Sequence, residues 1–140
     1  MENKMRITLE SDYALRILTV MARYGDIRDA KTISADTSVT IRFTLKILHK
    51  LVGADMVESY KGVRGGYKLK KSPDKITLKD VIELIDGPIA IARCVDSGEN
   101  CSLNCDKTSC VYHHIFDTIS IDLARKLSKI SISDVINKNY

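Results

Sequence analysis

No stretch of the 140-residue sequence approaches the roughly 20 consecutive apolar residues that a membrane-spanning helix needs. The first six residues also lack an apolar run of signal-peptide length. These two absences predict a cytoplasmic protein that has no membrane among its partners.

Internal repeats, low-complexity segments and the residue patterns of common catalytic sites are absent as well. We find no Ser/His/Asp arrangement, no phosphate-binding glycine loop and no paired carboxylates, so the sequence does not predict an enzyme. The hydrophobic content of 44% is enough for one compact domain, or for a domain with an additional packing helix.

The net charge of +4 is unevenly distributed along the chain. Residues 40–71 contain eight basic and two acidic side chains, whereas residues 91–140 contain six of each kind. A localised basic block favours a polyanionic partner, with nucleic acid as the first candidate. The alternative is a solvated basic helix face followed by a lysine-rich strand.

Apolar residues at helical spacing predict a helix from Ser11 to near Gly25, with Ser11 or Thr8 as its cap. Residues 32–37 can form one or two helical turns, and Thr40 can cap a longer helix after a short break. On that helix the predicted core face consists of Ile41, Leu45, Leu48 and Leu51. The predicted basic face consists of Arg42, Lys46, His49 and Lys50. This arrangement predicts a helix-turn-helix, whose second helix can enter the major groove of DNA.

Residues 56–60 and 67–70 alternate in the manner of strands, and the glycine-rich residues 61–66 between them predict a turn. A hairpin directly after a helix-turn-helix is a wing. We expect its three glycines to allow positive φ and a close approach to phosphates, and Arg64 at its tip to reach a minor groove or a phosphate. The alternative is a hairpin that only covers the core. The predicted DNA-binding residues are Thr40, Arg42, Lys46, Lys50, Lys61, Arg64, Gly65 and Tyr67.

The remaining pattern predicts a capped helix over residues 77–85 and a long C-terminal helix with an apolar stripe from Tyr112 to Ile130. One monomer has too little surface to cover that stripe, so we expect a twin helix and a twofold homodimer. The predicted fold is therefore mainly α with a small β-hairpin wing: a winged helix-turn-helix over residues 1–88, a cysteine-rich loop over 89–110, and a dimerisation helix with a tail over 111–140.

All four cysteines lie in that loop, at positions Cys94, Cys101, Cys105 and Cys110, and His113 follows. In a reducing cytosol, clustered cysteines favour metal binding or redox sensing over structural disulfides. Their spacing contains neither the paired C-x2-C of a zinc ribbon nor the ferredoxin pattern. Irregular spacing in a polar loop suits a labile iron–sulfur cluster, while zinc and redox-active thiols remain as alternatives.

Several segments together resemble the Rrf2 family of bacterial winged-helix transcription regulators over essentially the whole chain. They are Met5-Arg6-Ile7-Thr8 with Tyr13-Ala14-Leu15-Arg16, Leu45-Lys46-Ile47-Leu48 ending at Leu51, Gly62 with Gly65-Gly66-Tyr67-Lys68-Leu69, Ile76-Thr77-Leu78 with Asp80-Val81-Ile82, and the cysteine loop. The family includes iron–sulfur sensors of the IscR type, nitric-oxide sensors of the NsrR type and the cluster-free cysteine-metabolism regulator CymR.

The resemblance implies a [2Fe-2S] or [4Fe-4S] cluster held by three cysteines and one further ligand. Cys94 and Cys110 match the first and third family cysteines, and either Cys101 or Cys105 matches the middle one. His113 matches the fourth ligand of the IscR type. Asp12 matches that of the NsrR type, in which the partner subunit supplies the carboxylate.

The function implied is that of a DNA-binding regulator, a repressor in our expectation, whose cluster controls its affinity for double-stranded operator DNA. The cluster type, the signal, the target genes and the direction of regulation stay open. One alternative is a cluster-free regulator of the same family that responds to thiols or a metabolite. Another is a small redox protein whose basic block docks an acidic partner.

Overall fold

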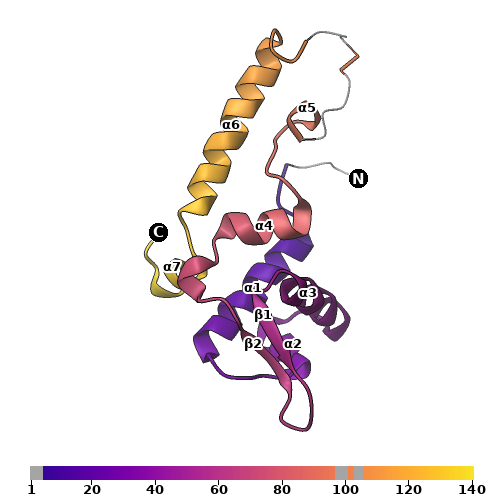
Figure 1. The fold of residues 1–140 in the computed structure, drawn as a ribbon, viewed down its shortest axis with the longest axis vertical. Coiled ribbons are helices and arrows are strands. Elements are labelled where there is room, and N and C mark those ends of the chain that lie inside the picture. The colour runs from indigo at the N-terminus through magenta and orange to yellow at the C-terminus, as the bar shows by residue number, and fades with distance from the viewer. Residues whose placement is uncertain (1–4, 97–100, 103–105) are drawn as a thin grey trace.

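The computed structural model of the chain describes residues 5–96, 101–102 and 106–140 (Figure 1). Its elements follow in the order α1 (Leu9–Tyr24), α2 (Ala30–Thr37), α3 (Ile41–Gly53), β1 (Val57–Tyr60), β2 (Gly66–Leu69), the 3-10 turn η1 (Pro73–Lys75), α4 (Leu78–Asp86), α5 (Arg93–Asp96), α6 (Val111–Ser128) and α7 (Ile132–Asn137). The predicted fold class is confirmed: the protein is mainly helical and has one antiparallel hairpin.

The ends of the first three helices are defined by side-chain caps and left-handed residues. The Thr8 hydroxyl accepts a hydrogen bond from the Ser11 amide at the start of α1, and Gly25, with φ of 70°, ends that helix. Asp29 caps α2, which therefore begins at Ala30, two residues before the predicted start. The Thr40 hydroxyl caps α3, as predicted.

The buried core joins the N-terminal two-thirds of the chain to its last helix. Its fully buried members include Ile17 and Leu18 of α1, Ile47 of α3, and Ile132 of α7. The C-terminal residues, which we predicted as a tail behind the dimerisation helix, thus return to the body that is formed by α1–α4 and the hairpin, and α7 is part of it. The Ile132 amide donates to the Ile76 carbonyl at 2.9 Å, and this bond anchors the return.

The wing is fixed at its base by a third stretch of chain. Strands β1 and β2 pair from Val57 opposite Leu69 to Tyr60 opposite Gly66. Arg28 and Tyr67 exchange both main-chain hydrogen bonds, at 3.0 and 2.8 Å. A Cβ on Gly66 would lie 2.4 Å from the Arg28 carbonyl oxygen, so this close pairing requires glycine. Positive φ occurs at Gly62 and Gly66 but not at Gly65, which corrects the expectation for the third glycine.

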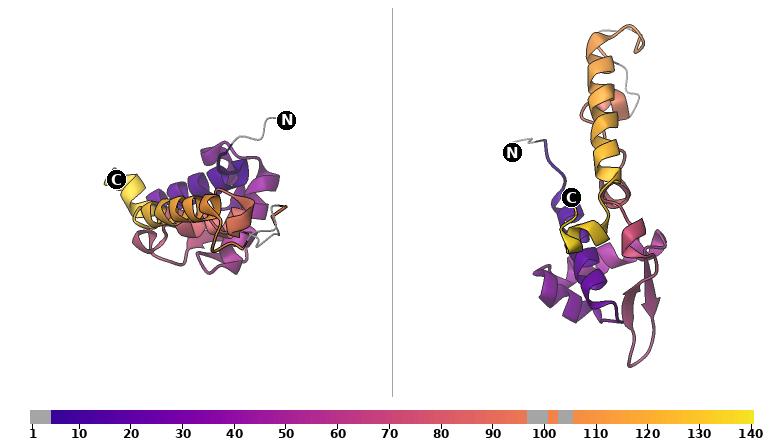
Figure 2. Two further views of the ribbon diagram at one scale, coloured as in Figure 1. Left: turned by 90° about the horizontal axis from the view of Figure 1, so that it is seen from above. Right: turned by 90° about the vertical axis from the view of Figure 1, so that its left-hand side faces the viewer.

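Helix α6 rises away from the body, at the end of the molecule opposite the wing (Figure 1; Figure 2, right). It packs against α4 and α5, and Ser120 is its only buried residue. Four apolar side chains at helical spacing on α6 are exposed; they are Tyr112, Ile115, Ile119 and Leu123. Among the described residues, no helix is both long and apolar enough to span a membrane.

Candidate DNA-binding surface and cysteine-rich segment

Helix α3 faces the core with a different side from the one we predicted. Thr44, Ile47, Leu48 and Leu51 are buried, whereas Ile41 and Leu45 are 42% and 45% exposed. The prediction was wrong for Ile41 and Leu45 because a threonine occupies the core-facing position. The Thr44 hydroxyl donates to the Val39 carbonyl, so its burial leaves no unpaired polar group.

The outer side of α3 carries the predicted basic residues, but their surroundings differ. Arg42 is exposed and makes no hydrogen bond or ion pair with the described residues. The Lys50 ammonium donates to the Glu10 carboxylate at 2.7 Å, and the Lys46 ammonium lies 3.4 Å from the same carboxylate. The hydrogen bond from Lys50 is the main reason why the pKa of Glu10 lies below its usual value.

The wing presents two further cations in the turn between β1 and β2. Lys61 and Arg64 are exposed, and neither forms an ion pair within the described part of the chain. Gly65 and Tyr67 have structural roles nearby: the Gly65 amide donates to the Gly62 carbonyl in the turn, and Tyr67 is held by Arg28. Thr40 likewise caps α3. The wing, α2 and α3 lie together at the end of the molecule away from α6 (Figure 1).

The cysteine-rich segment connects α4 to α6 through α5. Cys94 lies in α5 and Cys110 immediately precedes α6; both are half-buried, whereas Cys101 is exposed. Cys105 lies outside the described residues. Within residues 5–96, 101–102 and 106–140, no three His, Cys, Asp or Glu side chains are close enough together to hold a metal ion.

His113 occupies the first turn of α6, three residues after Cys110. Its Nδ1 atom is buried and has no hydrogen-bond partner among the described residues. A buried ring nitrogen without a partner costs free energy, and ligation is one way to satisfy it. The adjacent His114 is exposed.

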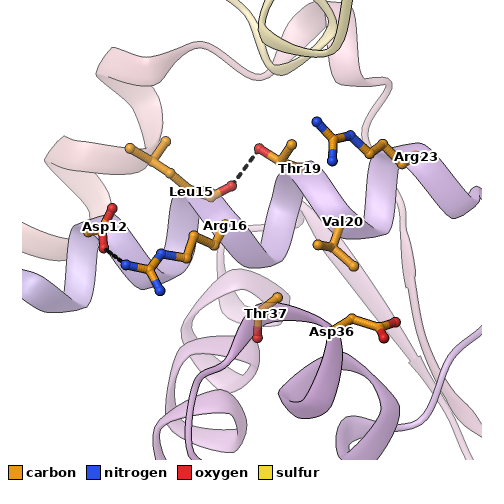
Figure 3. A pocket seen from close by; sticks show the side chains of 8 residues that line it. All are labelled: Asp12, Leu15, Arg16, Thr19, Val20, Arg23, Asp36 and Thr37. Atoms are coloured by element: carbon orange, nitrogen blue, oxygen red, sulfur yellow. Dashed lines mark hydrogen bonds and ion pairs between the residues drawn. The ribbon is translucent and has the colours of Figure 1, made fainter.

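Asp12 lies on α1, in the body. Its carboxylate accepts a hydrogen bond from Arg16 at 2.6 Å, on the wall of a pocket of about 300 Å³ between α1 and α2 (Figure 3). Arg23 and Asp36 also line this pocket. Within one chain, the Asp12 carboxylate therefore forms an ion pair with the Arg16 guanidinium.

A contact that we did not predict ties the start of α1 to the end of α4. The Asp86 carboxylate accepts hydrogen bonds from both the amide and the hydroxyl of Thr8. The Ile91 amide donates to the Ser120 hydroxyl at 3.0 Å and so connects the segment after α4 to α6. The start of the cysteine-rich segment is thus connected to α1 through Asp86 and to α6 through Ile91.

Comparisons with known proteins agree with this architecture. The Rrf2 family model, described as an iron-dependent transcriptional regulator, matches residues 7–138. The transcriptional regulator NsrR of Bacillus subtilis is 25% identical over 135 residues, which cover 94% of this chain and 90% of NsrR. The solved structure of CymR from B. subtilis has a TM-score of 0.77 at 21% identity and covers 96% of this chain and 98% of its own. That of IscR from T. potens has a TM-score of 0.77 at 17% identity, with coverages of 97% and 89%.

Proposed function

The chain belongs to the Rrf2 family of transcriptional regulators, and from that premise we propose that it binds operator DNA as a homodimer whose affinity is set by an iron–sulfur cluster. The observation that carries the DNA-binding part is the position of three cations, Arg42, Lys61 and Arg64, which lie on α3 and the adjoining wing and have no ion-pair partner among the described residues. We propose that the cluster binds to the cysteine-rich segment.

In the proposed complex α3 enters the major groove. Arg42 projects from the exposed side of this helix and is suited to bidentate contact with a guanine edge. Lys61 and Arg64 then contact phosphates or the adjacent minor groove, which fixes the orientation of the protein on the duplex. Exposed Ile41 and Leu45 beside Arg42 are suited to contacts with thymine methyl groups.

The proposed cluster ligands are Cys94, Cys110, either Cys101 or Cys105, and His113. The Nδ1 of His113, which has no partner among the described residues, supports this set over one that includes Asp12, whose carboxylate is already paired with Arg16. The cysteines would bind as thiolates and His113 as a neutral imidazole. When bound, the cluster supplies a centre that oxidation or nitric oxide can alter.

The proposed dimer forms through the apolar side of α6. Two copies of this helix would cover Tyr112, Ile115, Ile119 and Leu123, which one copy leaves exposed. Because the cysteine-rich segment joins α4 to α6, a change in its structure alters the distance between the two α3 helices. Affinity for a two-site operator depends on that distance.

A cluster-free regulator that responds through its thiols is the second candidate. A solved relative named as the global cysteine regulator shares the fold. In this case Cys94 and Cys110 act as redox-sensitive thiols, and no metal is retained.

Iron and sulfide content decide between the two candidates. We expect the anaerobically purified protein to contain iron and sulfide in near-equal amounts, together with visible absorption. Cys110→Ala should lose both, and His113→Ala should change the spectrum, whereas His114→Ala is the matched control and should leave it unchanged. Zinc, or no metal, in the wild-type protein contradicts the cluster. A change with Asp12→Asn but not with His113→Ala assigns the fourth ligand to Asp12.

DNA binding is tested with an operator obtained by selection from random duplexes. Arg64→Ala should weaken binding and reduce the slope of log affinity against log salt by about 1, because one phosphate contact is lost. Lys129→Ala, which removes an exposed cation beyond the end of α6, should leave the slope unchanged. Equal slopes for Arg64→Ala and the wild type would remove the wing from the interface.

A further inference from the structure

Glu10 lies in the first turn of α1 and contacts the basic side of α3. Its side chain is 18% exposed, whereas the side chains of Lys46 and Lys50 are 55% and 35% exposed. The carboxylate therefore lies beneath the two ammonium groups and contacts both, at 3.4 and 2.7 Å. Half of the basic residues predicted on the outer side of α3 are thus engaged by one acidic residue.

A carboxylate and a DNA phosphate compete for the same donors. Each offers anionic oxygens to an ammonium group, and a lysine that stays paired with Glu10 neutralises no phosphate. The other cations of the proposed interface, Arg42, Lys61 and Arg64, have no such partner among the described residues. The basic surface therefore contains two classes of residue, free and held.

We propose that Glu10 competes with DNA phosphates for Lys46 and Lys50. By holding these two lysines, the Glu10 carboxylate keeps them away from phosphates and lowers the affinity of the protein for every duplex. The inference rests on the proposed function, in which α3 faces DNA. Glu10 acts through the two lysines and contacts no base, so its effect is independent of DNA sequence. Base contacts then account for a larger share of the total affinity.

The position of Glu10 also connects its contact with the two lysines to α4, which leads into the cysteine-rich segment. Glu10 lies two residues after Thr8, which caps α1 and is bound by Asp86 at the end of α4. A displacement of α4 that pulls on Thr8 moves the first turn of α1, and with it the carboxylate that holds the lysines. Because α4, Thr8 and Glu10 belong to the same chain, this connection does not require a second subunit.

The test compares Glu10→Gln with Glu83→Gln in binding to a labelled duplex without operator sequence, over a range of salt concentrations. Glu83 is the matched control because it forms a similar pair with Lys79, at 3.0 Å on α4. Each released lysine that contacts a phosphate adds about 0.9 to the magnitude of the salt slope, so we expect Glu10→Gln to steepen it by about 1 to 2. We expect tighter binding at low salt, by the same factor for operator and non-operator duplexes.

Two further variants test whether the effect of Glu10 depends on the two lysines. In a Lys46→Gln/Lys50→Gln background, adding Glu10→Gln should leave the slope unchanged, because no held lysine remains to be released. An unchanged or shallower slope for Glu10→Gln in the wild-type background overturns the inference, since a purely structural tie between α1 and α3 predicts a lower melting temperature without a steeper slope. If the wild type binds no duplex at any salt concentration, the proposed function fails, and the inference fails with it.

Discussion

The DNA-binding body and the long helix α6 differ in how much of their apolar surface the chain itself covers. Thirteen buried residues of the body form one core, drawn from α1, α2, α3, β1, α4, α7 and the segments between them. Helix α6 has 18 residues, and only one of them is buried, the polar Ser120. The body is stabilised by its own contacts, whereas α6 leaves apolar side chains exposed.

The two regions also differ in their polar groups. In the body, Thr8, Asp29, Thr40 and Thr77 each accept a main-chain hydrogen bond at a helix start. At the start of α6, Cys110 makes no side-chain cap and the buried Nδ1 of His113 has no partner among the described residues. The body also has one buried polar atom without a partner among the described residues, Ser11 Oγ in α1, so the two regions differ in their helix caps rather than in the number of such atoms.

The largest effect on stability is expected from a substitution of Ile132, the residue of α7 that is buried in the core of the body. Ile132 is fully buried, and replacement by alanine should lower the free energy of unfolding by about 2–5 kcal/mol through lost burial and a cavity. Ile121→Ala is the control, because Ile121 is 49% exposed on α6 and should cost about 0.5 kcal/mol or less. Denaturant unfolding measures both. A loss below 1 kcal/mol for Ile132→Ala would show that α7 is not part of the cooperative unit.

Next in size is the effect on assembly. Ile119 is 47% exposed on the apolar side of α6, and Ile119→Asp places a charge in the proposed dimer interface twice per dimer. Loss of the remaining burial in both copies, with the desolvation of the carboxylates, should weaken the dimer by about 2–3 kcal/mol, or about 30- to 150-fold in Kd. Sedimentation measures it.

Ile121→Asp is the matched control for assembly. Ile121 has nearly the same exposure as Ile119 but lies two residues further along α6, on another side of the helix. Its replacement should leave the dimer intact. Equal dissociation of the two variants would place the interface elsewhere on α6.

Local signals in the sequence were sufficient for most of the body. Helical spacing and the caps Thr8, Thr40 and Thr77 predicted α1, α3 and α4, and the turn glycines predicted the hairpin. Helix α7 was missed because it has only six residues, and its position depends on packing against α1 rather than on its own periodicity. Such a short helix is not stable without tertiary contacts.

The candidate site was less predictable for a different reason. Glu10 meets Lys46 and Lys50 across 36 and 40 residues, and no spacing rule connects residues that far apart. The face of α3 was assigned wrongly because Thr44 was left out of the predicted core face, although its hydroxyl is satisfied inside the fold. The cysteine ligands remain predictions from the sequence, and Cys105 lies outside the described residues.

The pairing of Arg28 with Tyr67 at the base of the wing can be tested by comparing the stabilities of two glycine variants. Gly66→Ala would bring a Cβ to 2.4 Å from the Arg28 carbonyl and should destabilise the body by about 1–3 kcal/mol. Gly53→Ala lies at the end of α3 with nothing within 4 Å, and should stabilise the protein by up to about 1 kcal/mol. Thermal unfolding of both variants gives the sign directly. A neutral Gly66→Ala would mean that the pairing of Arg28 with Tyr67 does not hold the wing.

The smallest expected effect is the pH dependence of the Glu10 contact. Lys50 holds the pKa of Glu10 below its usual 4.5, so the contact contributes to stability above pH 4.5 and loses this contribution as the pH falls through the lower pKa of the folded state. The difference in unfolding free energy between the wild type and Glu10→Gln should therefore be below about 1 kcal/mol near neutral pH and shrink in acid. The same comparison in the Lys46→Gln/Lys50→Gln background should show no such change. A difference that grows in acid would mean that Glu10 is stabilised in its protonated form, which is incompatible with a carboxylate held by two lysines.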